Sequence, residues 1–299
     1  MASVNACRLC GSADLLIAYE GPIRAGGANS GAVDGYRVLH CNACAVEFLD
    51  PFPDNLEAYY EGEQYWEDHH GPLDVDKLWA KHGPEQRRWF YEVGLAALRG
   101  QRLADFGSGI GIFLDLARNT AAETVGVELA AHFRDHVEDR GHRFVASPAE
   151  LADASQDVIV SFDTLEHVPV PADFLAEMYR VLAADGVAYI GVPNQQDFLK
   201  ALVPDYLPFF YHLSHVYYFS AESLRRFLAE AGFQDITVGF VHKYDLNNLV
   251  AWAHDRKGVG TVGSPVFDEF TEDSFRQNLE RQGIASHILV SALKRGAAK

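Results

Sequence analysis

Residues 105–111 read Asp-Phe-Gly-Ser-Gly-Ile-Gly. They begin at the end of an expected strand, 102–106, and lead into a helical pattern that continues to about residue 119. Glycine adopts backbone conformations that are closed to other residues, so this spacing allows a tight turn and a close approach of the main chain to a ligand. The stretch therefore predicts a strand, a ligand-binding turn and a helix in succession.

The same alternation continues on both sides of the turn. A helix is expected from Pro84 to Leu98, with proline at its start and Gly100 after its end. Further strands are expected at 124–128, 144–146, 157–162 and 187–192, and further helices end at Arg140 or cover 173–182. Strands that alternate with helices predict an α/β fold with a Rossmann-like, doubly wound and mostly parallel sheet, whose ligand lies at the carboxyl ends of the strands.

Two residues sharpen the interpretation of the turn. The dinucleotide fingerprint has its third glycine one position later, where this chain has Ile112, so the helix is less suited to a pyrophosphate. Glu128 ends the next expected strand, where a carboxylate can accept hydrogen bonds from both hydroxyls of a ribose. These residues therefore disfavour an NAD-dependent oxidoreductase. The remaining alternative is that the turn is purely structural and binds no ligand.

The C-terminal part departs from simple alternation. Strands are expected at 233–241 and 286–293, and about forty residues, 242–284, lie between them. Helices are expected near 247–254 and 268–281 within this insertion. Long insertions near the ligand end of a sheet are usually functional, so we expect this one to bind substrate or contact another subunit.

The segment 54–84 is rich in aromatic residues and interrupted by glycine and proline. It either covers the edge of the sheet or lines the mouth of a substrate site. We therefore expect a small module at 1–53, an aromatic linker at 54–84 and the sheet domain at 85–299. The aromatic residues of the linker are Tyr59, Tyr60, Tyr65, Trp66 and Trp79.

All four cysteines lie in the first 44 residues, as two Cys-x-x-Cys pairs: Cys7 with Cys10, and Cys41 with Cys44. Such pairs are typical of a tetrahedral thiolate zinc site in a zinc-ribbon-like module, with the glycine-rich stretch 26–31 as the loop between them. Four sulfur ligands leave no open position, so the zinc is expected to be structural. Two disulfides or four unrelated thiols are the alternative.

Composition and charge exclude several classes of partner. Apolar residues make up 48% and charged residues 22%, which is ordinary for a globular protein. The formal net charge of −17 opposes binding to a phosphate backbone, so no nucleic-acid partner is expected. The chain has no apolar run of eighteen residues and no signal-peptide pattern at its start, so we expect a cytoplasmic protein that does not enter membranes.

Residues from about 85 to 240 resemble the class I S-adenosylmethionine (SAM)-dependent methyltransferases, in particular the small-molecule group. The matching stretches occur in the order of that family, and they are DFGSGIGIFLDLA (105–117), VGVEL (125–129), DVIVSFDTLEHVPVPADFLAEMYRVLAADGVAYIGVPN (157–194) and HVYYFSAESLRRFLAEAGF (215–233). The resemblance implies that Gly107 and Gly109 lie against the amino-acid end of SAM and that Asp105 holds its ammonium group.

The resemblance also implies contacts for the rest of the cofactor. Glu128 is expected to bind the ribose, and Leu129 to pack on the adenine. In this family an aspartate after the third strand often contacts the adenine amine; here that stretch is 147–150, which leaves backbone groups or Glu150 for the role. Phe162 and Asp163, at the end of the fourth strand, are expected to border the sulfonium.

The N-terminal stretches CRLC (7–10) and CNACAVEFLDPFP (41–53) resemble the zinc-binding domain of sugar C-methyltransferases that act on nucleotide-linked deoxysugars. In those enzymes a His-Glu-His run precedes the Tyr-Phe-Ser stretch. Here His215 matches the second histidine, but Leu213 and Ser214 stand at the first two positions. The missing glutamate argues against C-methylation by that route.

Two histidines are candidates for the general base. His215 ranks first because it matches the related motif and lies among aromatic residues, and His167 is second because it follows the fourth strand. A histidine has a suitable pKa for proton removal at neutral pH, although aromatic clusters of this kind are more often core. The sequence predicts methyl transfer from SAM to a polar small molecule, at oxygen, with transfer to carbon or nitrogen and a non-catalytic SAM-binding module as alternatives.

Overall fold

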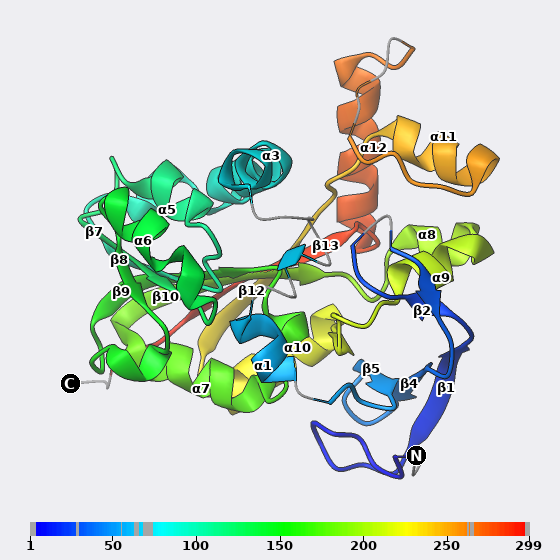
Figure 1. Cartoon of the computed structure of the whole chain (residues 1–299), viewed down its shortest axis with the longest axis horizontal. Helices are drawn as coiled ribbons and strands as arrows, with labels where there is room; N and C mark the ends of the chain where they lie inside the picture. The colour runs from blue at the N-terminus through cyan, green and yellow to red at the C-terminus, as the bar shows by residue number, and fades with distance from the viewer. Residues whose placement is uncertain are drawn as a thin grey trace. The chain divides into compact units, whose positions relative to one another are not determined.

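The computed structural model describes residues 4–27, 30–54, 56–62, 66–67, 74–261, 263 and 266–296. These residues form two compact units (Figure 1). The first unit comprises Met1–Pro53, Val192–Leu224 and Val238–Leu289, and the second comprises Asp54–Gly191, Arg225–Thr237 and Val290–Lys299. Tyr65 of the aromatic segment, and Ala28 and Asn29 of the glycine-rich stretch, lie outside the described residues.

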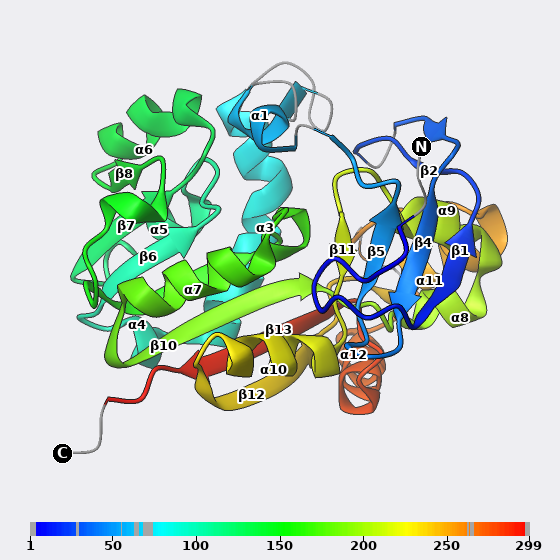
Figure 2. The ribbon, with the colours of Figure 1, turned by 90° about the horizontal axis from the view of Figure 1, so that it is seen from below.

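The main sheet has seven strands in the order β12-β13-β10-β9-β6-β7-β8. Its parallel pairs confirm the predicted Rossmann-like sheet (Figure 2). The register places Asp105 opposite Gly126 and Val160. The carboxyl ends of β6, β7 and β9 therefore lie at the same edge of the sheet. The strands that pair in parallel are β10 (Leu182–Pro193), β9 (Gln156–Phe162), β6 (Arg102–Phe106), β7 (Glu123–Val127) and β8 (Arg143–Val145).

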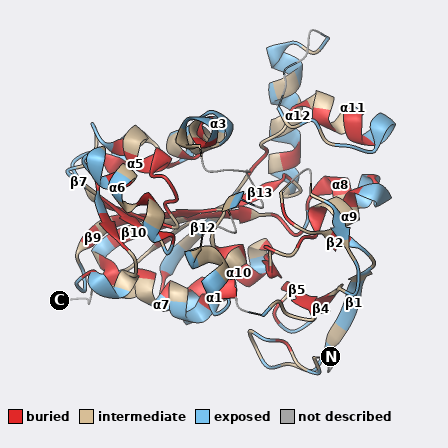
Figure 3. Ribbon diagram, viewed as in Figure 1, coloured by how far each residue is buried: buried red, intermediate tan, exposed pale blue. Residues whose placement is uncertain are grey.

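The central strands are buried along almost their whole length, as parallel strands with helices on both faces usually are (Figure 3). Ser161 is a polar exception in β9, and its Oγ donates a hydrogen bond to the carbonyl oxygen of Phe106, 2.9 Å away. This bond connects β9 to the end of β6, where the glycine turn begins.

One helix begins earlier than the sequence predicted. α3 covers Val75–Val93 with Pro84 inside it, whereas the proline had indicated a start at that residue. Asp74 caps the helix by accepting a hydrogen bond from the backbone N–H of Lys77 at 3.1 Å. Leu78 is buried before the proline and Trp89 and Val93 after it, so burial and the Asp74 cap outweigh the local signal of the proline.

Shorter helices complete the second unit. In the part of the chain that the structure describes, no helix is long and apolar enough to cross a membrane. The shorter helices are α1 (Leu56–Glu61), α4 (Leu95–Leu98), α5 (Ile112–Ala117), α6 (Arg134–Asp139) and α7 (Pro171–Val181), with single 3₁₀ turns at Ala131–Phe133, Pro148–Glu150 and Leu165–His167. α10 (Ala221–Glu230) follows later in the chain.

The C-terminal elements agree with the sequence pattern. β12 covers Gln234–Val241 and β13 covers His287–Leu293, as expected within a residue. Two helices, α11 (Leu246–Asp255) and α12 (Glu269–Gln282), occupy the insertion between them. The role of this insertion in substrate binding or subunit contact stays a prediction.

The first unit contains a four-stranded sheet in the order β1-β4-β5-β11, with antiparallel neighbours. An aromatic cluster that includes Tyr206, Phe210, Tyr211 and Trp252 forms the core of this unit. The strands are β1 (Leu15–Glu20), β4 (Arg37–Cys41), β5 (Glu47–Asp50) and β11 (Tyr217–Tyr218), beside a ribbon of β2 (Ile23–Arg24) and β3 (Ala32–Val33) and the short helices α8 (Phe198–Leu202) and α9 (Leu207–Phe210).

Candidate functional site

The glycine turn after β6 requires glycine at its first position. Gly107, Gly109 and Gly111 all have positive φ angles, of 85°, 52° and 78°. A Cβ atom at Gly107 would lie 2.2 Å from Oγ1 of Thr164 and 2.6 Å from its Cγ2. Any other residue would therefore be strained in its backbone and would collide with Thr164, so this position of the turn accepts only glycine.

Glu128 follows β7 and is fixed by the backbone around it. Its Oε2 accepts a hydrogen bond from the N–H of Gly109 and its Oε1 accepts one from the N–H of Ala130, both at 2.9 Å. Burial raises the pKa of this carboxyl above its usual value, and the two N–H donors, with that of Leu129, act against the increase. An ionised carboxylate has about four acceptor positions, so two bonds leave capacity for ligand hydroxyls.

Asp105, at the end region of β6, is only 5% exposed. Burial, followed by the negative charge of Glu128, raises the pKa of Asp105 to about 8. A cationic group bound nearby would lower that pKa, because it favours the ionised form. The predicted contact with an ammonium group thus has a suitable electrostatic setting, while the contact itself stays a prediction.

A cavity of about 460 Å³ opens at the carboxyl ends of these strands, within the size range of ligand sites. It brings together Gly107, Gly109, Glu128, Leu129, Asp163 and His167. Asp105, Phe162 and Glu150 are not part of the lining that the structure describes. The other lining residues are Tyr60, Trp66, Val127, Ala146, Pro148, Thr164, Val168, Pro169, Val170, Asp173, Phe174 and Glu177.

Asp163 is held in a left-handed conformation, with a φ angle of 52°. The indole Nε1 of Trp89 donates a hydrogen bond to its Oδ2 at 3.3 Å. The same indole stacks on Phe162, with the ring centroids 4.8 Å apart and the planes 5° from parallel. Phe162 therefore packs against the indole that donates to Asp163.

His167 lies in the cavity wall beside an aromatic hydroxyl. Its Nδ1 is 2.9 Å from the hydroxyl oxygen of Tyr60, and the two ring centroids are 5.4 Å apart. The preceding Glu166 is buried, and burial, followed by the charge of Asp163, raises its pKa well above the usual value. The hydrogen bond to Tyr60 orients the imidazole.

His215 belongs to the first unit. Its ring centroid is 3.7 Å from that of His212 and 6.0 Å from that of Tyr218. The sequence prediction that aromatic residues surround it is consistent with these contacts. Its role as a base stays a prediction.

Glu150 has a capping role in the structure. Its Oε1 accepts hydrogen bonds from the N–H groups of Ala146 and Ser147, at 2.8 and 3.0 Å. Together with the Ser147 side chain it forms a capping box on the 3₁₀ turn Pro148–Glu150. The carboxylate thereby shapes the loop whose Pro148 lines the cavity, and a direct contact with the cofactor stays a prediction.

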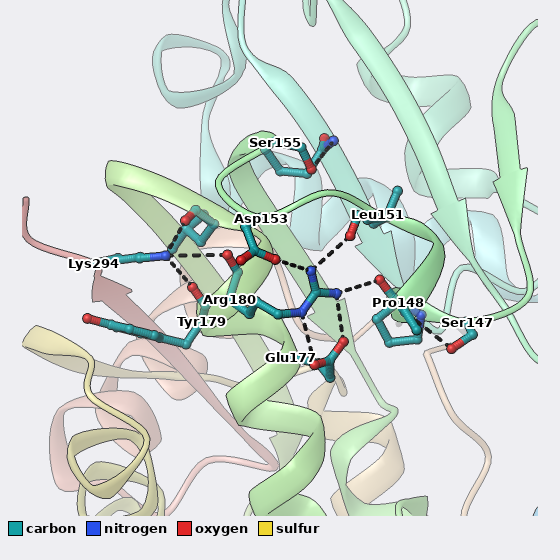
Figure 4. A network of polar contacts seen from close by, with 12 residues as sticks. Ser147, Pro148, Leu151, Asp153, Ser155, Glu177, Tyr179, Arg180 and Lys294 are labelled. Atoms are coloured by element: carbon teal, nitrogen blue, oxygen red, sulfur yellow. Dashed lines mark hydrogen bonds and ion pairs between the residues drawn. The ribbon is translucent and has the colours of Figure 1, made fainter.

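Arg180 joins that loop to α7 through all five of its N–H donors (Figure 4). Its Nη2 donates to the carbonyl oxygen of Pro148 at 2.8 Å, and its Nη1 donates to that of Leu151 at 2.9 Å. Asp153 accepts from Nη1 at 2.6 Å, and Glu177 accepts from Nε and Nη2 at 3.0 and 2.7 Å. Because Pro148 and Glu177 both line the cavity, Arg180 fixes two parts of its wall.

Several lining residues were not predicted from the sequence. Thr164 touches the position where a Gly107 side chain would stand, and Trp66 lies 3.2 Å from the corresponding position at Gly109. Asp173 and Glu177 face the cavity from α7, one helical turn apart. The aromatic segment was the available signal for Tyr60 and Trp66, since lining a site was one of its two interpretations.

The four cysteines form a separate cluster in the first unit. The Sγ atoms of Cys7 and Cys44 are 3.7 Å apart, those of Cys10 and Cys41 are 3.5 Å apart, and all four lie within 4.8 Å of one another. A disulfide needs about 2.05 Å, whereas a tetrahedron with Zn–S bonds of about 2.3 Å has edges of about 3.8 Å. The donor set and its spacing therefore fit a zinc ion.

The two Cys-x-x-Cys turns have the same backbone geometry. Gly11 follows the first turn with a φ angle of 74°, and Ala45 follows the second with a φ angle of 56°. The N–H of Gly11 donates to the carbonyl oxygen of Cys7 at 2.9 Å, and that of Ala45 donates to Cys41 at 2.8 Å. The two turns therefore bring all four sulfur atoms together, within 4.8 Å of one another.

Comparison with known proteins identifies the same region. Residues 77–238, more than half of the chain, match the family model described as "Methyltransferase domain". A Mycolicibacterium smegmatis protein named "Probable S-adenosylmethionine-dependent methyltransferase" is 31% identical over 179 residues, which are 56% of this chain and 68% of that protein. The chain spans 64% of the length of two related Mycobacterium tuberculosis proteins.

Two other comparisons concern one curated relative and one solved structure. A "Ubiquinone biosynthesis O-methyltransferase" of Paracidovorax citrulli is 32% identical over 123 residues, 37% of this chain and 52% of that protein. The second is a chain from the solved structure titled "Complex between the Haloferax volcanii Trm112 methyltransferase activator and the putative methyltransferase". It matches with a TM-score of 0.52 and 15% identity, over 82% of this chain and 99% of that one. The second likeness shows a shared fold.

Proposed function

The chain belongs to the SAM-dependent methyltransferase family, and we propose that it transfers the methyl group of SAM to an oxygen atom of a polar small molecule. The acceptor in this proposal is a sugar, a nucleotide-linked sugar or a secondary-metabolite intermediate. The observation that carries the proposal is the cavity at the ends of β6 and β7, where a glycine turn and the fixed Glu128 carboxylate lie together.

The glycine turn and Glu128 support the proposed place of the cofactor. We assign Gly107 and Gly109 to its amino-acid end, because both glycines line the cavity. Asp105 is assigned to its ammonium group, and Glu128 to the two ribose hydroxyls. These contacts would leave the exposed side chain of Leu129 for the adenine.

The remaining cofactor contacts are proposed from the loops after β8 and β9. The adenine amine is assigned to the loop that Glu150 caps, through backbone groups or the carboxylate itself. The sulfonium is assigned to the neighbourhood of Asp163 and of Phe162, the residue before it. A carboxylate beside a sulfonium would stabilise the charge of the bound cofactor.

Bound SAM supplies a methyl carbon that is open to in-line displacement. The residues of this chain must align the acceptor oxygen with that carbon and remove the hydroxyl proton. We place His167 in this role, because it lines the cavity and Tyr60 orients its ring. If the Tyr60 oxygen accepts a hydrogen bond from the protonated Nδ1 of His167, the unprotonated Nε2 can remove the hydroxyl proton of the methyl acceptor. His215 stays the other candidate base.

Transfer to oxygen is supported by the likeness to the ubiquinone-pathway O-methyltransferase, which extends over 37% of this chain. Transfer to nitrogen or carbon is the alternative within the same chemistry. Ser214 stands where the related C-methyltransferases have a glutamate, so carbon is the less favoured of the two. A SAM-binding module without catalysis is the alternative from another class.

The proposal includes one structural zinc ion held by Cys7, Cys10, Cys41 and Cys44. These sulfurs would fill a tetrahedral site, so the metal would stabilise the residues around it and take no part in methyl transfer. We keep residues 1–53 as the zinc module, 54–84 as the linker and 85–299 as the methyltransferase domain. A location in the cytoplasm, where thiols stay reduced, agrees with the proposed thiolate ligands.

The proposal is tested by incubating the purified protein with SAM that carries a labelled methyl group and a panel of sugars, nucleotide sugars and hydroxylated aromatic compounds. Mass spectrometry then identifies the product and the methylated atom. We expect label on an oxygen of one acceptor class. SAM binding without transfer to any acceptor in the panel would favour the non-catalytic module, and label on carbon or nitrogen would overturn the assignment to oxygen.

A further inference from the structure

Arg24 is a cation that the proposed chemistry leaves without a role. It ends β2 in the first unit and is fixed by its backbone on both sides: it pairs with Ala32 of β3, its N–H donates to the carbonyl oxygen of Tyr211 at 3.0 Å, and its own carbonyl accepts from Leu213 at 3.1 Å. Its side chain is partly exposed. A fixed backbone and a partly exposed head are suited to a preformed binding residue.

The guanidinium of Arg24 packs against aromatic residues. Its Cζ lies 4.4 Å from the centre of the Phe209 ring, and its Nε donates a hydrogen bond to the carbonyl oxygen of Phe209 at 3.1 Å. Burial lowers the pKa of Arg24, and Tyr218, Tyr244 and Tyr206 oppose that effect. Tyrosines therefore surround a cation that has lost part of its hydration.

Arg24 lacks the carboxylate that usually accompanies such a group. Among the described residues no carboxylate forms an ion pair with it, and its two Nη atoms have no hydrogen-bond acceptor. Acidic groups are not scarce, since the chain has 42 of them against 25 lysines and arginines. The arginines that do pair with carboxylates are Arg37, Arg102, Arg134, Arg140, Arg180, Arg226, Arg256, Arg276 and Arg295.

A partly desolvated cation is costly unless an anion compensates it. The free edge of a guanidinium presents two parallel N–H groups, which match two oxygens of one phosphate. An oxyanion bound at this edge would therefore compensate the partly desolvated charge of Arg24.

We propose that Arg24 binds a phosphate group of a phosphorylated or diphosphate-linked small molecule through Nη1 and Nη2. The proposed site lies within the first unit, and its occupation does not depend on methyl transfer. A carboxylate could use the same two N–H groups, so the experiment must compare both kinds of oxyanion.

The test is calorimetric titration of the full-length, zinc-loaded protein with inorganic pyrophosphate and, separately, with succinate, both without SAM. We expect saturable binding of pyrophosphate that weakens about tenfold or more in Arg24→Gln, as for the loss of a charge-assisted pair. Arg24→Lys should retain part of the affinity. Arg256→Gln is the matched control, because it removes one positive charge from an exposed ion pair of the same unit and should bind as the wild type does.

A second measurement uses the wild-type protein alone, so it does not depend on how the variants fold. Pyrophosphate should protect Arg24 from modification by phenylglyoxal, as read by peptide mass spectrometry. No saturable binding, equal binding by Arg24→Gln, or no protection would overturn the proposal, and tighter binding of succinate would replace phosphate by carboxylate. Binding of pyrophosphate through Arg24 without methyl transfer to any acceptor would contradict only the proposed function.

Discussion

Two acidic residues at neighbouring strand ends have different environments and are expected to have different tasks. Glu128 is partly exposed and accepts N–H groups from Gly109 and Ala130. Asp105 is buried, and its pKa is raised to about 8. The first is thus a preformed acceptor of hydrogen bonds, and the second is a carboxyl that favours its neutral form until a cation binds.

Replacing Glu128 by alanine should weaken SAM binding by about 1–3 kcal/mol, the range for losing hydrogen bonds to a charged group. Calorimetric titration with SAM measures the change. Glu123→Ala is the control, since Glu123 is an exposed acid at the other end of the same strand and should leave the affinity unchanged. Equal affinities of the wild type and Glu128→Ala would show that the ribose lies elsewhere.

The pKa of Asp105 predicts a pH-dependent stability of the protein without SAM. Because the folded-state pKa is about 8 and the ordinary value is 3.8, the stability contributed by the neutral form is complete below pH 4 and is lost as the pH rises toward 8. Asp105→Asn should remove this loss, so its free energy of unfolding should fall less between pH 5 and pH 8 than that of the wild type. Urea unfolding of both proteins at pH 5 and pH 8 tests this; identical pH dependence would contradict it.

The base is assigned by comparing two histidines. If His167 removes the acceptor proton, His167→Ala should lower kcat by about 10²–10⁴-fold while the affinity for SAM is kept. Tyr60→Phe should lower kcat less and shift its pH profile, because the hydrogen bond that orients the ring is lost. A large loss in His215→Ala with normal turnover in His167→Ala would reverse the assignment.

At the scale of elements, the wall of the cavity depends on one arginine that joins α7 to the loop after β8. Arg180 uses all five donors on Pro148, Leu151, Asp153 and Glu177. Its contacts neutralise the Glu177 carboxylate, and they also hold the carbonyl groups of the loop. The loop and the helix therefore keep their spacing together.

Arg180→Met should raise the KM for SAM about tenfold and leave kcat almost unchanged, because the wall contacts the cofactor equally in the ground state and the transition state. Arg180→Lys should restore part of the affinity, since it retains the charge and some of the donors. Arg226→Met removes an exposed helical ion pair and serves as the control. A loss confined to kcat would argue against this positioning role.

At the scale of the whole molecule, the zinc site is expected to stabilise one unit and not the other. Metal analysis should find one zinc per chain, and Cys41→Ser should abolish it, because structural zinc binding is coupled to folding. Hydrogen exchange should then increase in the first fifty residues and stay unchanged in the strands β6, β7 and β9. Far less than one zinc per wild-type chain, or two disulfides by mass, would contradict the prediction.

The sequence predicted the sheet well, because buried parallel strands leave continuous apolar runs that local patterns detect, as at β9 and β10. It failed at the start of α3, where Pro84 gave a stronger local signal than the cap at Asp74. In the site, the glycine turn and Glu128 were found because they follow strand ends. Thr164 against Gly107, and Tyr60 against His167, depend on contacts between segments far apart in the chain, which no local pattern records.

The indoles around the cavity give the protein an optical property. Trp66 lines the cavity beside Gly109, and Trp89 stacks on Phe162 while donating to Asp163. Indole emission responds to nearby charge and to the loss of water, and a sulfonium compound brings both changes. Occupancy of the cavity should therefore alter the intrinsic fluorescence, which would let cofactor exchange be followed in real time without a label.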